Sequence, residues 1–156
     1  MRLTTKGRYA VMAMADLARV HSGTPVALAE IAQRQDISLS YLEQLFSKLR
    51  KAKLVLASRG PGGGYRLSTP ASKINIASII KAVDEPIRTT RCEVESEFGC
   101  QGKQTRCLTH DLWFELGEQI SLFLTAISLD DVVQGRVAGI AVTPTVLREE
   151  PQREVA

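Results

Sequence analysis

The feature that most constrains the fold is a pair of short amphipathic segments separated by a tight polar turn and followed at once by a glycine-rich hairpin. The first segment places Leu28, Ile31 and Ala32 on one side of a helix. Residues 35–38 form the polar turn, with one apolar residue in it. The second segment shows the i, i+3, i+4, i+7 spacing of a helix at Leu42, Leu45, Phe46 and Leu49.

The start of this second helix has two candidate caps. Ser40 and Glu43 have the spacing of a capping box, in which serine and glutamate side chains each bond a backbone N–H at the helix start. Ser38 is the alternative cap, two residues earlier.

The hairpin completes a recognisable order of elements. Residues 54–56 and 65–67 read as two short strands, and four glycines and a proline lie between them. A helix is predicted before the pair, over residues 5–21, and another after the hairpin, over residues 74–83. This order predicts a mainly α fold with a small β-hairpin wing, a winged helix-turn-helix, with its core between Ala10 and Val83.

The rest of the chain is expected to form three further parts. Residues 86–110 form a cysteine-bearing loop after the winged domain of residues 1–85. A long C-terminal dimerisation helix over residues 111–134 has an apolar stripe at Leu112, Leu116, Ile120, Phe123, Leu124 and Ile127. Ser128 and Asp131 are placed to cap a short final helix, and residues 135–156 are expected to be a disordered tail.

Charge is divided unevenly along the chain. Residues 1–66 carry a net charge of +7 and the remaining ninety residues carry −4. A basic half joined to an acidic half is typical of a protein with one module that faces nucleic acid, although an unevenly charged solvated surface gives the same pattern. We find no membrane span and no secretory signal, so the expected location is the cytoplasm.

The second helix of the pair has a polar outer face suited to reading DNA. With its apolar residues turned inward, it presents Ser40, Glu43, Gln44, Ser47, Lys48 and Lys51. Gln can pair with adenine, Glu can accept from cytosine, and Lys neutralises backbone phosphate. Arg59, at the start of the glycine-rich loop, suits a narrow minor groove. An ordinary flexible hairpin is the alternative, and no Gly-Lys-Ser/Thr follows to make it a nucleotide-binding loop.

Three cysteines and one histidine cluster downstream. Cys92, Cys100, Cys107 and His110 supply thiolate and imidazole ligands within nineteen residues, and the odd cysteine number argues against a disulfide framework. Zinc and an iron–sulfur cluster both fit these ligands, and redox-active thiols are a third possibility. No nucleophile stands beside a base, so the chain is not expected to be an enzyme.

Together these motifs resemble the IscR family of iron–sulfur cluster regulators. The resemblance rests on residues 1–10 (MRLTTKGRYA), 37–46 (ISLSYLEQLF), 59–65 (RGPGGGY), 91–92 (RC) and 107–110 (CLTH). It extends from Met1 to about residue 133, and the ordered set is far more specific than any one motif.

The resemblance implies a homodimer that binds a 2Fe-2S cluster and represses an operon for cluster biogenesis. The implied ligands are Cys92, Cys100, Cys107 and His110, and the implied contacts to double-stranded operator DNA come from Ser40, Tyr41, Glu43, Gln44 and Arg59. Cluster-assembly proteins are the expected source of the cluster.

Two departures from the family leave other readings open. The cysteine gaps of seven and six residues are longer than the usual family spacing, so a 4Fe-4S cluster or zinc remains an alternative. Related regulators that sense nitric oxide or iron share the three cysteines, and His110 favours the biogenesis regulator over them.

Overall fold

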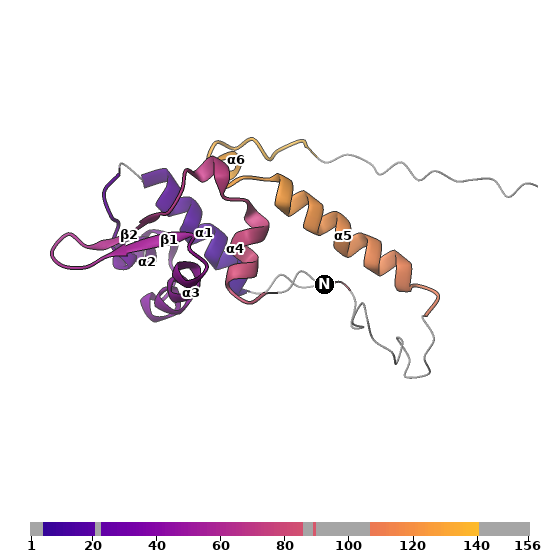
Figure 1. Ribbon diagram of the computed structural model, residues 1–156, viewed down its shortest axis with the longest axis horizontal. Helices are drawn as coiled ribbons and strands as arrows, with labels where there is room; N and C mark the ends of the chain where they lie inside the picture. Colours follow the sequence, from indigo (N-terminus) through magenta and orange to yellow (C-terminus); the bar gives the residue numbers. More distant parts are fainter. Residues whose placement is uncertain (1–4, 21–22, 86–88, 90–106, 141–156) are drawn as a thin grey trace, which may run out of the picture.

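The computed structural model describes residues 5–20, 23–85, 89 and 107–140 (Figure 1). Its elements are α1 (Thr5–Val20), α2 (Leu28–Gln35), α3 (Leu39–Lys51), β1 (Val55–Ser58), β2 (Gly64–Leu67), the 3-10 turn η1 (Ala71–Lys73), α4 (Ile76–Ala82), α5 (His110–Ala126) and α6 (Leu129–Val133). The mainly helical fold with a two-stranded antiparallel wing, predicted from the sequence, is confirmed. Among the described helices, none is long and apolar enough to cross a membrane.

The core forms around α1, which packs against α2, α3, α4, α6 and β2. Its largest fully buried side chains are Met14, Leu17, Ile31, Leu42, Phe46, Leu49, Val55, Ile79, Ile80, Val83 and Leu129. The expectation that the core ends at Val83 is wrong, because Ile127 and Leu129 are buried in the same cluster. Residues that follow the cysteines in the sequence are therefore part of the core of the winged domain.

The turn between α2 and α3 is closed by Asp36 and Ser38. Asp36 adopts a left-handed conformation with φ of 52°, and its N–H donates to the carbonyl oxygen of Ala32. Ser38 is the cap of α3, since its Oγ accepts the N–H of Tyr41 at 3.2 Å. The structure thus selects Ser38 over Ser40, which lies inside the first turn of α3 and is exposed. A capping box at Ser40 and Glu43 is not formed.

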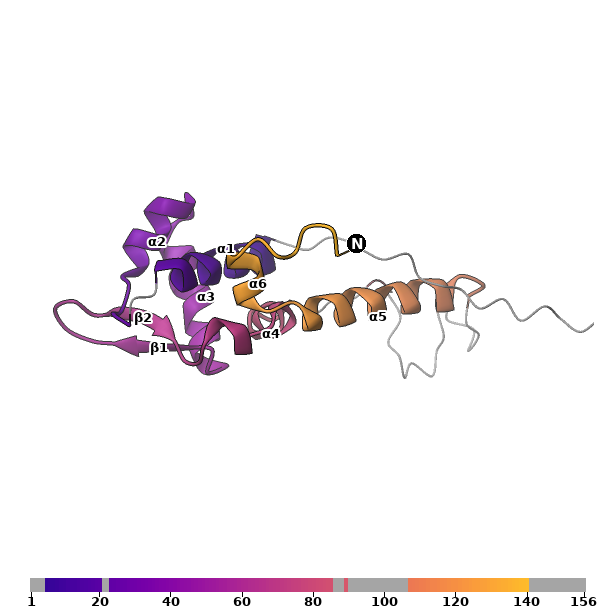
Figure 2. The same cartoon turned by 90° about the horizontal axis from the view of Figure 1, so that it is seen from above.

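The wing is a short hairpin held at its base and through Tyr65. The backbone of Tyr65 exchanges two hydrogen bonds of 2.8 Å with Val26, and its ring meets that of Phe46 edge-on, with centroids 5.0 Å apart. Val55 pairs with Leu67 and Ser58 with Gly64, and along both strands only Val55 and Leu67 are buried. The loop of residues 59–63 between the strands extends away from the helices (Figures 1 and 2). A Cβ atom on Gly64 would lie 2.3 Å from the carbonyl oxygen of Val26, so glycine is required there.

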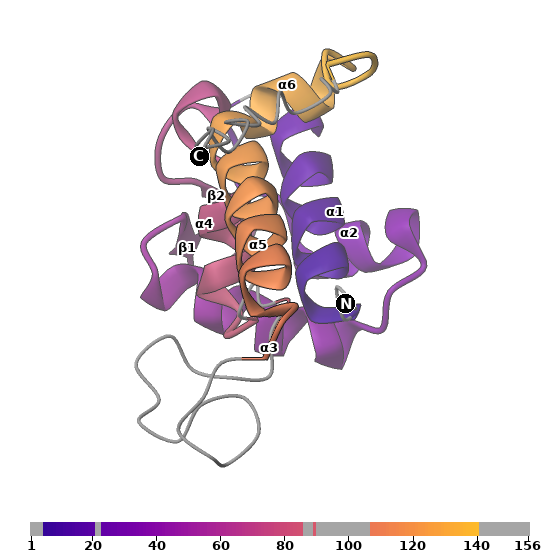
Figure 3. The same ribbon diagram turned by 90° about the vertical axis from the view of Figure 1, so that its right-hand side faces the viewer.

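Helix α5 runs outward from the winged domain and is anchored at its C-terminal end (Figures 1 and 2), and in Figure 3 it stands in front of α1 and α4. The N–H of Ile76 donates to the carbonyl oxygen of Ile127 at 3.0 Å, and that of Leu129 to Ile74 at 2.7 Å. The predicted capping of α6 is confirmed as a capping box between Ser128 and Asp131. Hydrogen bonds from Ser128, and then from Arg136, lower the pKa of Asp131 to about 2.

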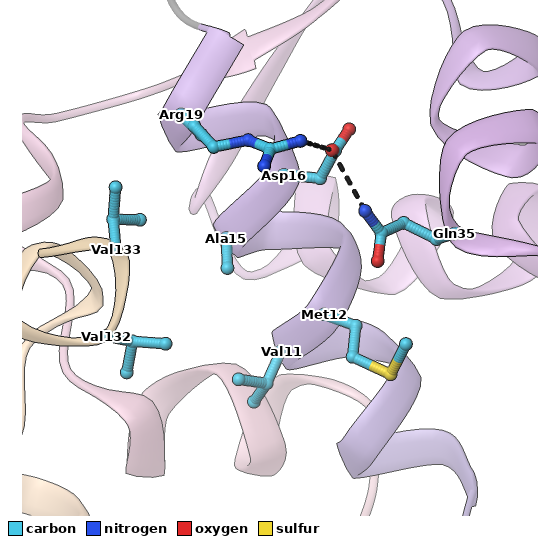
Figure 4. A pocket seen from close by; sticks show the side chains of 8 residues that line it. All are labelled: Val11, Met12, Ala15, Asp16, Arg19, Gln35, Val132 and Val133. Atoms are coloured by element: carbon cyan, nitrogen blue, oxygen red, sulfur yellow. Dashed lines mark hydrogen bonds and ion pairs between the residues drawn. The ribbon is translucent and has the colours of Figure 1, made fainter. Parts of the chain in front are cut away.

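A buried carboxylate ties α1 to α2. The side chain of Asp16 is fully buried and accepts hydrogen bonds from Arg34 at 2.7 and 3.0 Å and from Gln35 at 3.0 Å. Arg19 approaches the same carboxylate at 3.4 Å, at the edge of a hollow that α6 closes with Val132 and Val133 (Figure 4). Nε and Nη2 of Arg34 both donate to Oδ2 of Asp16, and Nε also reaches Oδ1 at 3.3 Å, so this charge-assisted contact fixes α2 against α1.

Asp16→Ala is expected to lower the free energy of unfolding by about 3 kcal/mol, because it removes the buried carboxylate that accepts hydrogen bonds from Arg34 and Gln35. Urea unfolding followed by circular dichroism measures this change. Glu30→Ala is the control, since Glu30 contacts the same Arg34 at 3.6 Å but is exposed, and it should change stability little. Equal losses in the two variants would contradict the role given to Asp16.

Candidate DNA interface and metal centre

Helix α3 turns its apolar side inward and leaves a polar face in solvent. Leu42, Leu45, Phe46 and Leu49 are at most 3% exposed. Of the predicted outer face, Ser40, Glu43, Gln44 and Lys51 are exposed, whereas Ser47 and Lys48 are half-buried. Most of this face is therefore accessible to DNA.

Tyr41 does not stand free on this surface. It is half-buried, and its ring meets that of Tyr9 edge-on, with centroids 6.0 Å apart and planes at 84°. The contact joins the first turn of α3 to α1. Tyr41 can therefore fix the position of the exposed residues Ser40, Glu43 and Gln44.

Lys48 is held by a residue that follows another helix. Its Nζ lies 2.8 Å from Oδ2 of Asp84, which follows the C-terminal end of α4. The side chain of Lys48 is 36% exposed, so it remains near the polar face of α3 while paired. Neither the partner nor the distance could be inferred from sequence, because nothing local relates residue 48 to residue 84.

Arg59 lies at the far end of the wing. It is exposed and directly precedes Gly60, whose φ of 95° is in the left-handed region that glycine adopts without strain. The N–H of Gly63 donates to the carbonyl oxygen of Gly60 at 2.9 Å and closes the turn. The backbone of the loop thus presents Arg59 away from the domain.

Two of the four predicted metal ligands lie together at the head of α5. Cys107 is half-buried and His110 is 8% exposed, and the N–H of His110 donates to the carbonyl oxygen of Cys107 at 3.0 Å. The imidazole of His110 stacks on the ring of Phe114, with centroids 6.4 Å apart. Cys92 and Cys100 lie outside the described residues. Across the described parts of the chain, no three potential metal ligands gather in one place.

The position of Cys107 and His110 suits a metal or cluster that carries thiolate ligands. Both residues lie at the N-terminal end of a helix of seventeen residues, where the backbone N–H groups favour negative charge. A thiol and an imidazole are ligands for iron–sulfur clusters and for zinc alike. The donor set in the described chain fits either group.

Helix α5 also exposes large apolar side chains. Leu112, Trp113, Leu116, Leu122 and Phe123 are between 39% and 61% exposed. Of the stripe predicted from the sequence, Ile127 is buried in the core of the winged domain and Leu124 packs against that core. The C-terminal residues of the stripe therefore anchor α5 to the winged domain. The apolar residues on the preceding turns remain exposed to solvent.

Sequence comparison identifies the family. Residues 3–135 match the Rrf2 family, described as iron-dependent transcriptional regulators. The HTH-type transcriptional regulator IscR of Xenorhabdus nematophila is 56% identical over 136 residues, which are 87% of this chain and 81% of the relative. The regulator of the same name from Vibrio atlanticus is also 56% identical, over 86% of this chain and 76% of its own.

Solved structures agree with this assignment. T. potens IscR superimposes with a TM-score of 0.70 at 33% identity, covering 92% of this chain and 94% of its own. CymR, the global cysteine regulator of B. subtilis, gives a TM-score of 0.72 at 32% identity, covering 86% and 98%. The relatives are named as regulators and not as enzymes. The chain is therefore a transcriptional regulator that belongs to the Rrf2 family and resembles its IscR members.

Proposed function

We propose that this regulator is a cytoplasmic homodimer that represses genes for iron–sulfur cluster biogenesis and whose operator affinity depends on a bound 2Fe-2S cluster. The observation that carries the proposal is the placement of Cys107 and His110 at the head of α5, in a chain that also exposes the polar face of α3. The ligands would be Cys92, Cys100, Cys107 and His110, with cluster-assembly proteins as the source of the cluster. The similarity to regulators named IscR supports this set.

On the DNA side, α3 would enter the major groove. Glu43 and Gln44 are exposed on its first turns, where a recognition helix reaches base edges. Ser40 stands beside them, and Tyr41 supports them from the side of α1. Arg59 would enter the neighbouring minor groove from the wing.

On the sensing side, the four ligand residues link the cysteine-bearing segment to α5. A bound cluster would supply iron coordination that joins these four side chains. His110 must be neutral to coordinate, so a proton competes at its ring nitrogen. The protein can change its DNA affinity only as far as its two conformations differ in their affinity for the cluster.

The proposal is tested on protein purified without oxygen. We expect about two iron and two sulfide per chain, with a visible spectrum of the 2Fe-2S type. Operator titration before and after removal of the cluster should give different affinities. One zinc without sulfide would establish a structural zinc site instead, and a 4Fe-4S spectrum would favour a nitric-oxide or iron sensor.

Arg59→Ala is expected to weaken operator binding by about 1–3 kcal/mol, the scale of one specific contact. The reason is the exposed position of Arg59 at the tip of the wing. A fluorescence-anisotropy titration at fixed salt measures the change. Arg66→Ala is the control, because Arg66 is also an exposed cation of the wing but lies on β2 near its base. If both substitutions weakened binding equally, Arg59 would contribute only its positive charge and no specific contact.

A further inference from the structure

Among the residues that the structure describes, Asp84 is the acidic residue in an ion pair with α3. The pair joins Lys48 of α3 to the end of α4 across the surface on which the DNA-facing side chains lie. Asp84 itself is 76% exposed. Exposed pairs of this kind contribute little to stability, since solvent screens them and both side chains lose freedom. The pair therefore contributes little to holding α3 against the end of α4.

The neighbours of Asp84 fix its direction. Val83 is fully buried and Glu85 is 7% exposed, so the residue between them is held on both sides. The carboxylate of Glu85 accepts the backbone N–H of Gly7 in the first turns of α1. A Cβ atom on Gly7 would lie 2.6 Å from that carboxylate, so the approach depends on glycine. With Val83 and Glu85 locked inward, the side chain of Asp84 faces outward beside α3.

The backbone of Asp84, and not its carboxylate, ends α4. Its φ of 57° is in the left-handed region, and its N–H donates to the carbonyl oxygen of Lys81 at 3.1 Å. Glycine usually occupies this position after a helix, because it adopts the conformation without steric cost. Closing α4 therefore needs no carboxylate, and the acidic group is available for Lys48.

The carboxylate of Asp84 has a basic environment like that of a DNA phosphate bound to protein. The pKa of Asp84 is held below its ordinary value, first by the hydrogen bond and charge of Lys48 and further by the charges of Lys6 and Lys51. These lysines come from the start of α1 and from the last turns of α3. An anion among several lysines at the edge of a recognition helix is the arrangement that phosphate contacts produce.

We propose that Asp84 acts as an internal substitute for a DNA phosphate, whose carboxylate competes with the DNA backbone for Lys48. DNA must displace Asp84 before Lys48 can neutralise a phosphate. The carboxylate thereby weakens binding to DNA of any sequence, and base contacts made by other residues of α3 are unaffected. The inference rests on α3 being the DNA-facing helix, as in the proposed function.

The test compares Asp84→Asn, Lys48→Met and the double variant by anisotropy on a non-operator duplex at several salt concentrations. Asparagine keeps the shape of the side chain and tolerates the left-handed backbone. Asp84→Asn should bind about two- to fivefold more tightly, the range of an exposed ion pair. Its slope of log affinity against log salt should steepen by up to about 0.9, the value for one phosphate contact, because competition from Asp84 leaves Lys48 off the phosphate in part of the bound molecules.

The gain must depend on Lys48. In the Lys48→Met background, Asp84→Asn should lose more than half of its effect, and a gain that is mostly retained there would overturn the proposal as a general charge effect. Weaker binding of Asp84→Asn would also overturn it, because Asp84 would then position Lys48 for phosphate. Asp130→Asn is the matched control, since it removes the same charge from the ion pair between Asp130 of α6 and Arg136, and it should leave DNA affinity unchanged.

Lys51→Met separates this inference from the proposed function. Lys51 is exposed on α3 and should lose phosphate contact whatever Asp84 does. Weaker binding of Lys51→Met together with an unchanged Asp84→Asn overturns the inference alone. Unchanged binding of both variants overturns the assignment of α3 to DNA as well. Loss of cluster control, measured separately by operator titration with and without the cluster, bears only on the proposed function.

Discussion

Cys92→Ala is expected to leave a folded protein that holds no cluster and binds a cluster-dependent operator about 5- to 150-fold more weakly, the usual range for coupling between two sites. The winged domain should remain folded because its described core draws on residues 10–83 together with Ile127 and Leu129, and on none of the cysteines. Iron and sulfide counts, circular dichroism and operator titration measure the three parts of this result.

Salt-dependent binding should survive the loss of the cluster. The basic residues that precede the wing remain, so Cys92→Ala should still bind duplex DNA with an affinity that falls as salt rises. If Cys92→Ala binds the operator as tightly as the loaded protein, the cysteine-bearing segment does not control DNA binding, and a structural zinc becomes the better interpretation.

Adding Glu43→Ala to Cys92→Ala refines the experiment. Glu43 is exposed on the outer face of α3, where an unpaired carboxylate is unfavourable near phosphates. Its removal should let the cluster-free protein bind operators that it otherwise rejects. Gln33→Ala serves as the control, because Gln33 is exposed on α2, outside the predicted reading face. If Gln33→Ala also restored binding, Glu43 would not be the residue that makes the cluster-free protein reject these operators.

The order of the elements could be predicted because local pattern determines them. Apolar residues at helical spacing gave α3 its buried side, and the glycine-rich loop defined the wing. Errors arose where two local signals competed, as at the two serines that could cap α3. The choice of Ser38 follows from Asp36, whose left-handed conformation ends α2 and brings Ser38 to the cap position.

Contacts between residues far apart in sequence could not be predicted in this way. Lys48 looked like a free phosphate-binding cation, and only the fold shows Asp84 beside it. The Asp16–Arg34 pair and the carboxylate of Glu85 at Gly7 are of the same kind, since each joins different helices. The predicted metal ligands fall between these two situations. Cys107 and His110 are close in sequence, so their proximity could be predicted, whereas Cys92 and Cys100 lie outside the described residues.

Phe123→Glu is expected to separate the proposed homodimer into monomers. Leu112, Leu116 and Phe123 lie on one face of α5, since they are separated by four and seven residues, and all three are exposed. In a two-fold interface the substitution occurs twice, so with about 2 kcal/mol for each central aromatic the dimer should weaken by about 4 kcal/mol, or roughly a thousandfold. Sedimentation equilibrium at micromolar concentration measures it.

Leu122→Glu is the matched control for this experiment. Leu122 is also exposed and lies on the same helix, but its position is about 100° around the axis from Phe123. The control should stay dimeric. Because a palindromic operator engages two recognition helices at once, Phe123→Glu should lose about 10²- to 10⁴-fold in affinity for the full site yet bind a half-site like the unsubstituted chain. A monomeric unsubstituted chain, or equal dissociation of both variants, would show that this face of α5 does not form the dimer.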